Sequence, residues 1–293
     1  MKQKAYLLVL ILAVLLLFST FQALGMTHNR PIKKGILLVA FGSSIPEAQI
    51  SFQNIDKKVK AAFPGTPVRW GYTSHIIRKI LAKKGQHLDS VEMALARMMD
   101  EGFTHVAVQS LHTISGMEFH DLQINAHAFG RMAGGFDHIS VGYPLLATED
   151  DFRRVTEVIL RHIPEERKKD EAVVLMGHGT THPSNAFYAA LMYHLQRKDA
   201  NIFVGTVEGA PEIDEIKEML LEKKIKKAYL MPFMSVAGVH AREDLAGEDE
   251  GSWKSILTKE GIGCVPILKG TAEYDDMVDI WVDHLKEEMA LFE

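Results

Sequence analysis

Short apolar runs alternate with amphipathic stretches along the chain from Lys33 onward. Short bounded apolar runs indicate buried strands, and apolar residues three or four positions apart indicate helices. The predicted strands are Gly35–Ala40, Pro67–Tyr72, His105–Gln109, Ile139–Val141, Ala172–Met176, Ile202–Thr206, Ala228–Met231 and Cys264–Ile267. The predicted helices are Pro46–Phe63, Ile76–Lys84, Leu88–Glu101, Glu149–His162, Asn185–Arg197, Ile213–Lys223, Trp253–Glu260 and Tyr274–Phe292. This alternation predicts an α/β protein with parallel sheets.

The two halves of the chain resemble each other in sequence. The matched segments are Gly35–Pro46 with Ala172–Pro183, Ala107–Leu122 with Tyr229–Leu245 and, more weakly, Gly71 with Gly205. A repeated set of strands and helices predicts two lobes of the same topology. We expect their parallel sheets to face each other across a cleft.

The first residues have the layout of a secretory signal peptide. Lys2 and Lys4 precede an apolar run over Ala5–Phe18, and the small residues Ala23 and Gly25 follow at the spacing of a cleavage site. The run is short for a membrane span, which needs about 20 apolar residues. We therefore expect export to the periplasm and no stable membrane span in the mature chain. An uncleaved membrane anchor is the alternative.

These patterns divide the chain into a signal peptide and two α/β lobes. The expected bounds are 1–25 for the signal peptide, 26–165 for the first lobe and 166–293 for the second lobe. The charged run Glu165–Asp170 is the expected hinge, and the last helix is a candidate to pack on the first lobe. The second lobe is expected to carry a metal site, because histidine and glutamate residues follow its predicted strands.

Charge and cysteine content restrict the chemistry. A formal net charge of −5 argues against a general nucleic-acid-binding protein. Cys264 is the only cysteine in the sequence, which excludes an intrachain disulfide and a cysteine-rich zinc or iron–sulfur site. Any metal site must therefore use histidines and carboxylates.

His178, Glu208 and His240 each follow a predicted strand of the second half. Parallel strands end on the same edge of a sheet, where α/β proteins place their ligands, so these side chains can converge. Two imidazoles and a carboxylate suit Co²⁺, Ni²⁺, Fe²⁺ or Zn²⁺. Each residue also has a structural alternative: a cap for His178, an acid at a helix N-terminus for Glu208 and an exposed polar loop for His240.

The repeat places different side chains at the matching positions of the first half. The matched pairs are Phe41 with His178, Ser74 with Glu208 and Glu118 with His240. One lobe therefore offers the metal ligands, and the other offers an aromatic ring and one carboxylate.

Five segments of the sequence resemble the class II tetrapyrrole chelatases, most closely the CbiK-type cobalt chelatases. The segments are Leu37–Ser44, Ser110–Phe119, Met176–Asn185, Val204–Glu212 and Met231–Gly247. The resemblance covers nearly all of the chain after the predicted signal peptide. It implies two flavodoxin-like lobes with a macrocycle bound between them, and it implies that His178, Glu208 and His240 hold the metal.

The resemblance also implies the reaction, which is insertion of Co²⁺, or alternatively Fe²⁺, into sirohydrochlorin with release of two protons. His178 and Glu118 are the expected proton acceptors, since imidazole titrates near neutral pH. The residues expected to contact the substrate are Phe41, Ser43, Ser44, His112 and Ser235. Basic groups expected to face the carboxylates of the substrate are Arg69, Arg78 and Lys79.

The sequence also suggests a haem site and two alternative functions. His120 is a candidate axial ligand for haem at a separate site, and a surface histidine is the alternative. The first rival function is an exported carrier of metal, haem or tetrapyrrole that keeps a chelatase site. The second is an ordinary periplasmic solute-binding protein. A homo-oligomer is expected.

Overall fold

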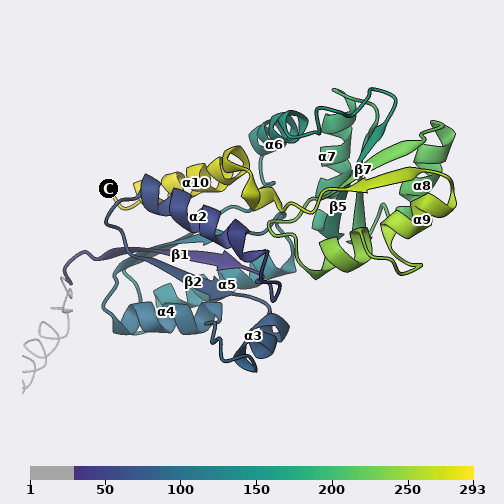
Figure 1. Cartoon of the computed structure of the whole chain (residues 1–293). Helices are drawn as coiled ribbons and strands as arrows, with labels where there is room; N and C mark the ends of the chain where they lie inside the picture. Colours follow the sequence, from purple (N-terminus) through teal and green to yellow (C-terminus); the bar gives the residue numbers. More distant parts are fainter. Residues whose placement is uncertain (1–29) are drawn as a thin grey trace, which may run out of the picture. The chain divides into compact units, whose positions relative to one another are not determined.

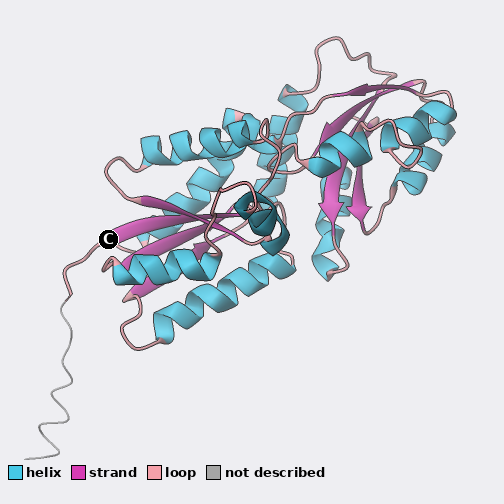
Figure 2. Cartoon of the chain, turned by 60° about the horizontal axis from the view of Figure 1, so that its bottom comes forward, coloured by secondary structure: helices cyan, strands magenta, loops and turns pink. Residues whose placement is uncertain are grey.

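Within residues 30–293, eight parallel strands form two four-stranded sheets with helices packed around them (Figure 1, Figure 2). The computed structural model describes residues 30–293, so the predicted signal peptide lies outside the described residues. Residues 33–293 form one compact unit. Among the residues described, no helix combines the length and apolar character that a membrane crossing requires.

The two sheets have the same strand order. The first sheet is ordered β2-β1-β3-β4 and the second β6-β5-β7-β8. The strands are β1 (Lys34–Ala40), β2 (Val68–Tyr72), β3 (His105–Ser110), β4 (His138–Gly142), β5 (Ala172–Gly179), β6 (Ile202–Glu208), β7 (Lys227–Pro232) and β8 (Gly263–Pro266). The helices are α2 (Gln49–Ala62), α3 (His75–Ala82), α4 (Val91–Asp100), α5 (Met117–Arg131), α6 (Glu149–Arg161), α7 (Ala186–Gln196), α8 (Ile213–Glu222), α9 (Trp253–Lys259) and α10 (Asp275–Ala290). The predicted α/β class with parallel sheets is confirmed.

The central strands are buried on both faces. In β1, Ile36 and Leu38 pack into one hydrophobic cluster, while Leu37 and Val39 pack into another. Strands covered on both faces read as continuous apolar runs rather than as an alternating pattern. This is why short apolar runs identified the strands in the sequence.

The strand registers support the internal repeat. Val39 of β1 pairs with Gly71 of β2, and the matching residue Met176 of β5 pairs with Gly205 of β6. The pairing of β3 with β1 agrees in the same way with the pairing of β7 with β5. The weakest match in the sequence, between the two glycines, therefore corresponds to equivalent positions in the two sheets.

The sequence prediction missed a helix between β3 and β4. This segment reads as polar in the sequence, but it forms α5, which buries Phe119, Leu122 and Ala126. These three residues are spaced three and four positions apart, which is the spacing of one helix face. The polar residues around them concealed this narrow apolar stripe.

The helices after β4 and β8 pack on the opposite halves of the chain. α6 follows β4 but packs against α7 of the second half. α10 follows β8 but packs against α2, β3 and β4 of the first half, and Figure 1 shows it beside α2. The two sheets are thus joined by two helices that cross in opposite directions. The predicted lobe boundary between residues 165 and 166 stays a prediction.

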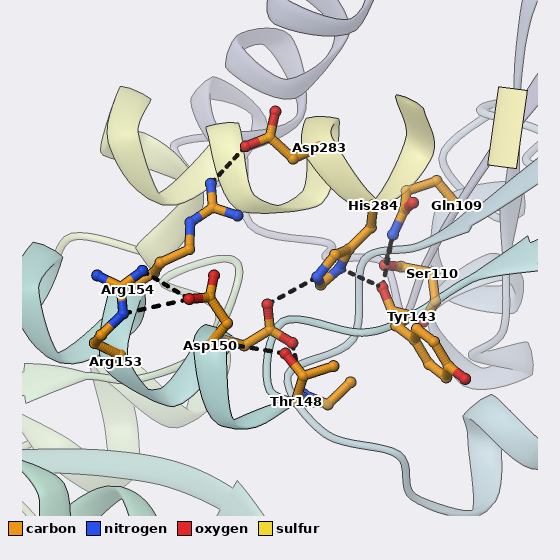
Figure 3. A network of polar contacts seen from close by, with 11 residues as sticks. Gln109, Ser110, Tyr143, Thr148, Asp150, Arg153, Arg154, Asp283 and His284 are labelled. Atoms are coloured by element: carbon orange, nitrogen blue, oxygen red, sulfur yellow. Dashed lines mark hydrogen bonds and ion pairs between the residues drawn. The ribbon is translucent and has the colours of Figure 1, made fainter. Parts of the chain in front are cut away.

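Charged side chains join α6 to α10 where they cross. Arg154 donates to Asp283 at 2.6 Å, and His284 Nε2 lies 2.9 Å from Asp151 Oδ1. The other ring nitrogen of His284 lies 3.1 Å from the carbonyl oxygen of Tyr143 (Figure 3). His284 therefore links the C-terminal helix both to α6 and to the segment after β4.

Candidate metal centre

His178 lies at the carboxyl edge of the second sheet. β5 continues through His178 to Gly179, so the strand is longer than the apolar run that predicted it. Gly179 pairs with Glu208 and has a φ of +80°. A Cβ atom at this glycine would overlap the carbonyl oxygen of Glu208. Glycine is needed for both reasons, and it lets His178 and Glu208 occupy adjacent strand ends.

The hydrogen bond of His178 fixes which of its nitrogens is available. Its Nδ1 lies 3.1 Å from the carbonyl oxygen of Gly179. A carbonyl only accepts, so Nδ1 carries the proton and donates it. In the neutral ring, Nε2 is then unprotonated and can bind a metal ion.

His240 is oriented in the same way by a carboxylate. It precedes the short π-helix Ala241–Leu245, and its Nδ1 lies 2.5 Å from Asp244 Oδ2. A carboxylate behind a histidine holds the ring and leaves Nε2 free for a metal ion. The sequence prediction gave Asp244 no role, although a histidine and an aspartate four residues apart can meet on one helical turn.

The three predicted ligands lie together at this edge. The rings of His178 and His240 are perpendicular, with centroids 4.8 Å apart. His178 Nδ1 lies 4.0 Å from Glu208 Oε2, and the Glu208 side chain is 64% exposed. Across residues 30–293, no group of three or more His, Cys, Asp or Glu side chains is already arranged to hold a metal ion. The ligands are therefore near one another, and the exposed Glu208 carboxylate is free to turn toward the two rings.

Side chains of the first half approach the same point. The ring centroid of Phe41, directly after β1, lies 6.2 Å from that of His178, and Phe41 is 42% exposed. Glu118, in the first turn of α5, interacts electrostatically with His178. The carboxyl edges of the two sheets thus bring an exposed aromatic ring and a carboxylate toward the histidines.

Glu118 is held as a carboxylate. Its Oε2 lies 3.1 Å from His112 Nε2, and it accepts a hydrogen bond from the Thr73 hydroxyl at 3.4 Å. Burial raises the pKa of Glu118, but His112, Thr73 and the charge of His178 together lower it below its usual value. Glu118 is therefore in its carboxylate form near neutral pH, and a carboxylate near the histidines can accept a proton.

Comparison with known proteins identifies the family. A family model described as cobalt chelatase (CbiK) matches residues 34–290. The chain belongs to the cobalt chelatase (CbiK) family.

Two curated relatives of this CbiK-family chain are both named as sirohydrochlorin cobaltochelatases. Sirohydrochlorin cobaltochelatase CbiKC of Nitratidesulfovibrio vulgaris is 48% identical over 88% of this chain and 91% of its own. Sirohydrochlorin cobaltochelatase of Salmonella typhimurium is 31% identical over 87% of this chain and 96% of its own. Among solved structures, SirB from Bacillus subtilis with Fe³⁺ has a TM-score of 0.57 and 16% identity, and it covers 88% of this chain and 96% of its own. This last likeness shows the shared fold.

The residues predicted to contact substrate are not all equally accessible in this CbiK-family chain. Ser43 is buried, and its hydroxyl accepts a hydrogen bond from the backbone N–H of Ile45 at 3.2 Å. Ser44 and Ser235 are half-buried. Their roles as substrate contacts stay predictions.

A cavity of about 230 Å³ adjoins Glu118 in the first half. Arg78 lines it, and within the described chain its guanidinium makes no hydrogen bond or ion pair. Arg69 is instead paired with Glu101 at 2.7 Å. Of these two arginines, only Arg78 has an unpaired guanidinium group beside the cavity that Glu118 lines.

His120 is exposed on α5. Its ring centroid is 5.0 Å from that of His182, which precedes the short helix Pro183–Asn185. His182 Nδ1 accepts a hydrogen bond from the backbone N–H of Ser184 at 3.2 Å. The haem site predicted at His120 stays a prediction.

Proposed function

We propose that this protein inserts Co²⁺ into sirohydrochlorin and releases two protons. The observation that carries the proposal is the paired orientation of His178 and His240 at one sheet edge. Both rings donate from Nδ1 and leave Nε2 free, next to Glu208 and opposite Phe41 and Glu118. Membership of the cobalt chelatase (CbiK) family and the 48% identical cobaltochelatase support the same conclusion.

His178, His240 and Glu208 are the proposed metal ligands. Imidazole and carboxylate together bind divalent first-row ions without the tight hold of thiolates. Such a site can take up Co²⁺ and then give it to the ring, which a chelatase must do. Fe²⁺ is the proposed alternative metal, because the same ligands accept both ions.

The two protons come from the pyrrole N–H groups of the substrate. Glu118 and His178 are the proposed acceptors, one from each half of the chain. The exposed Phe41 ring provides an apolar surface for the macrocycle. Ser43, Ser44 and Ser235 complete the proposed substrate contacts.

An anaerobic absorbance assay tests this proposal. The chain without residues 1–25 is mixed with sirohydrochlorin and Co²⁺, and then in a second series with Fe²⁺, at far less than one equivalent of protein. Conversion of many equivalents above the uncatalysed rate is the expected result, and the two rates rank the metals. A spectral change that stops at about one ring per chain would instead identify a tetrapyrrole carrier.

Export, haem binding and self-association complete the proposal. We propose that residues 1–25 direct the chain to the periplasm, on the basis of their basic, apolar and small-residue pattern. Cell fractionation tests this step.

The proposed haem site at His120 is tested by adding haem to the protein. An unchanged haem spectrum would exclude the site. Light scattering tests the proposed homo-oligomer.

A further inference from the structure

His112 faces the protein interior rather than open solvent. Its side chain is only 11% exposed, and both ring nitrogens face protein groups. Nδ1 lies 2.8 Å from the hydroxyl of the buried Ser110, and Nε2 lies 3.1 Å from Glu118 Oε2. A residue placed in this way has little surface to offer a substrate.

The partners of His112 determine where its proton lies. The 3.1 Å contact between Nε2 and Glu118 lies outside regular hydrogen-bond geometry, but a carboxylate only accepts, so the contact is favourable when Nε2 carries the hydrogen. In the neutral ring Nδ1 is then an acceptor, and it receives the hydroxyl hydrogen of Ser110. The oxygen of Ser110 in turn lies 3.5 Å from the backbone nitrogen of His112, which leaves that hydroxyl hydrogen available. Ser110, His112 and Glu118 thus form an ordered chain in the first half.

The two polar contacts of Glu118 fall on the same oxygen. His112 Nε2 and the Thr73 hydroxyl both approach Oε2. Within residues 30–293, no hydrogen bond or ion pair reaches Oε1. Holding one oxygen fixes the carboxylate plane, and it leaves the second oxygen free to accept a proton.

We propose that His112 is a positioning residue that holds the Glu118 carboxylate at Oε2 and directs its Oε1 to the reacting ring. This inference rests on the proposed function. During insertion a pyrrole N–H bond breaks, its electron pair stays on nitrogen, and the proton forms a bond to Oε1. The proton then passes to water in the adjoining cavity, which Glu118 lines. His112 does not touch the substrate in this scheme, and its effect on the reaction comes from the orientation of the Glu118 carboxylate.

Steady-state kinetics of three variants test the role. His112→Ala is expected to lower kcat about 10–100-fold, with less than about a two-fold change in the KM for sirohydrochlorin. His112→Gln should recover most of kcat, because its amide N–H can replace Nε2–H. His87→Ala, at an exposed histidine far along the chain from this group, should behave as the unaltered protein. Circular dichroism confirms that each variant folds.

A double variant separates positioning from substrate contact. Glu118→Gln should lower kcat, and adding His112→Ala should then cost little more, since the two residues act as a unit. A raised KM with unchanged kcat in His112→Ala, or additive losses in the double variant, would overturn the proposal. Unchanged kinetics in His112→Ala would overturn it as well.

A spectroscopic measurement distinguishes this inference from the proposed function. In protein labelled with ¹⁵N-histidine, the His112 resonances should report protonated Nε2 and unprotonated Nδ1. Glu118→Gln should shift the Nε2 resonance. The opposite tautomer, or no shift, would refute the positioning role even in an active chelatase. If the protein converts no sirohydrochlorin, the proposed function fails, and the resonances still decide whether His112 holds Glu118.

Discussion

The buried contact between His284 and Asp151 allows a quantitative test of how α6 and α10 hold the two halves together. The two side chains are 7% and 3% exposed, and their atoms lie 2.9 Å apart. Both nitrogens of His284 face acceptors, one a carboxylate and the other the carbonyl oxygen of Tyr143. Two acceptors require two N–H donors, so His284 is an imidazolium ion in this arrangement.

His284→Leu removes this ion but leaves Asp151 partly satisfied. The carboxylate still accepts hydrogen bonds from the backbone N–H groups of Ala147 and Thr148 at 3.2 and 2.8 Å. We therefore expect a loss of about 2–3 kcal/mol in the free energy of unfolding at pH 6, at or just below the lower end of the range for breaking a buried pair. Urea unfolding measures this loss as a lower midpoint at an unchanged slope.

A half-exposed histidine on the same helix pair provides the matched control. His162, directly after α6, lies 2.8 Å from Asp276 of α10. His162→Leu removes a similar contact that water already screens, so it should cost less than about 1 kcal/mol. Equal losses in the two variants would show that burial does not set the magnitude.

The pH dependence of the free energy of unfolding tests whether His284 is charged in the folded protein. Burial lowers the pKa of His284, but Asp151 and the Tyr143 carbonyl outweigh it and raise the pKa above its usual value of 6.5. Burial raises the pKa of Asp151, but His284 and Thr148 outweigh it and lower the pKa below 3.8. Stabilisation by His284 is complete below about pH 6.5 and is lost as pH rises through the raised pKa. Stabilisation by Asp151 is present above about pH 3.8 and is lost as pH falls through the lowered pKa.

The difference in stability between the unaltered protein and His284→Leu should therefore be largest between about pH 4 and 6.5 and smaller at pH 9. A difference that stays constant from pH 6 to 9, or that grows over this range, would refute the assignment of His284 as a buried imidazolium.

Three further predictions concern the metal centre. His178→Ala should abolish Co²⁺ insertion without changing the circular dichroism spectrum, because it removes a proposed ligand and proton acceptor; full activity would contradict this role. Asp244→Ala should weaken Co²⁺ binding about 10–100-fold in a binding titration, because His240 loses the partner that orients it; unchanged affinity would mean that Asp244 does not orient the ring. Gly179→Ala should lower the free energy of unfolding by more than about 1 kcal/mol, because of its positive φ and the overlap with Glu208; an unchanged melting temperature would disprove this requirement.

The parts of the fold that depend on local pattern were predictable from the sequence. Strands such as β1 and β5 lie in the middle of sheets covered on both faces, so each is a continuous apolar run. α5 was not predictable in the same way, because only a narrow stripe of its residues is buried. The crossing of α6 and α10 is a tertiary feature, and no local pattern in either helix indicates which half it packs against.

In the candidate site, too, some features follow from the sequence pattern and others depend on tertiary contacts. The repeat and the strand ends pointed to His178, Glu208 and His240, which lie near one another in the structure, and their role as metal ligands stays a prediction. The roles of their neighbours depend on side-chain contacts that the sequence does not fix. Asp244 behind His240, and His112 behind Glu118, are set by side-chain distances of 2.5 and 3.1 Å.

The repeat also shows how one fold can place the proposed metal ligands in one half and the proposed proton acceptor Glu118 in the other. Equivalent backbone positions carry different side chains: Ser74 caps α3 by accepting a hydrogen bond from the backbone N–H of Ile77, whereas its counterpart Glu208 stays exposed at the metal centre. The proposed metal ligands then all belong to the second half of the chain, and Glu118 belongs to the first half. The separation between them depends on how the two sheets are joined, and α6 and α10 make that connection by each packing on the opposite half. The charged contacts between these two helices therefore help to fix the distance between Glu118 and the proposed metal ligands, although these contacts lie outside the candidate site.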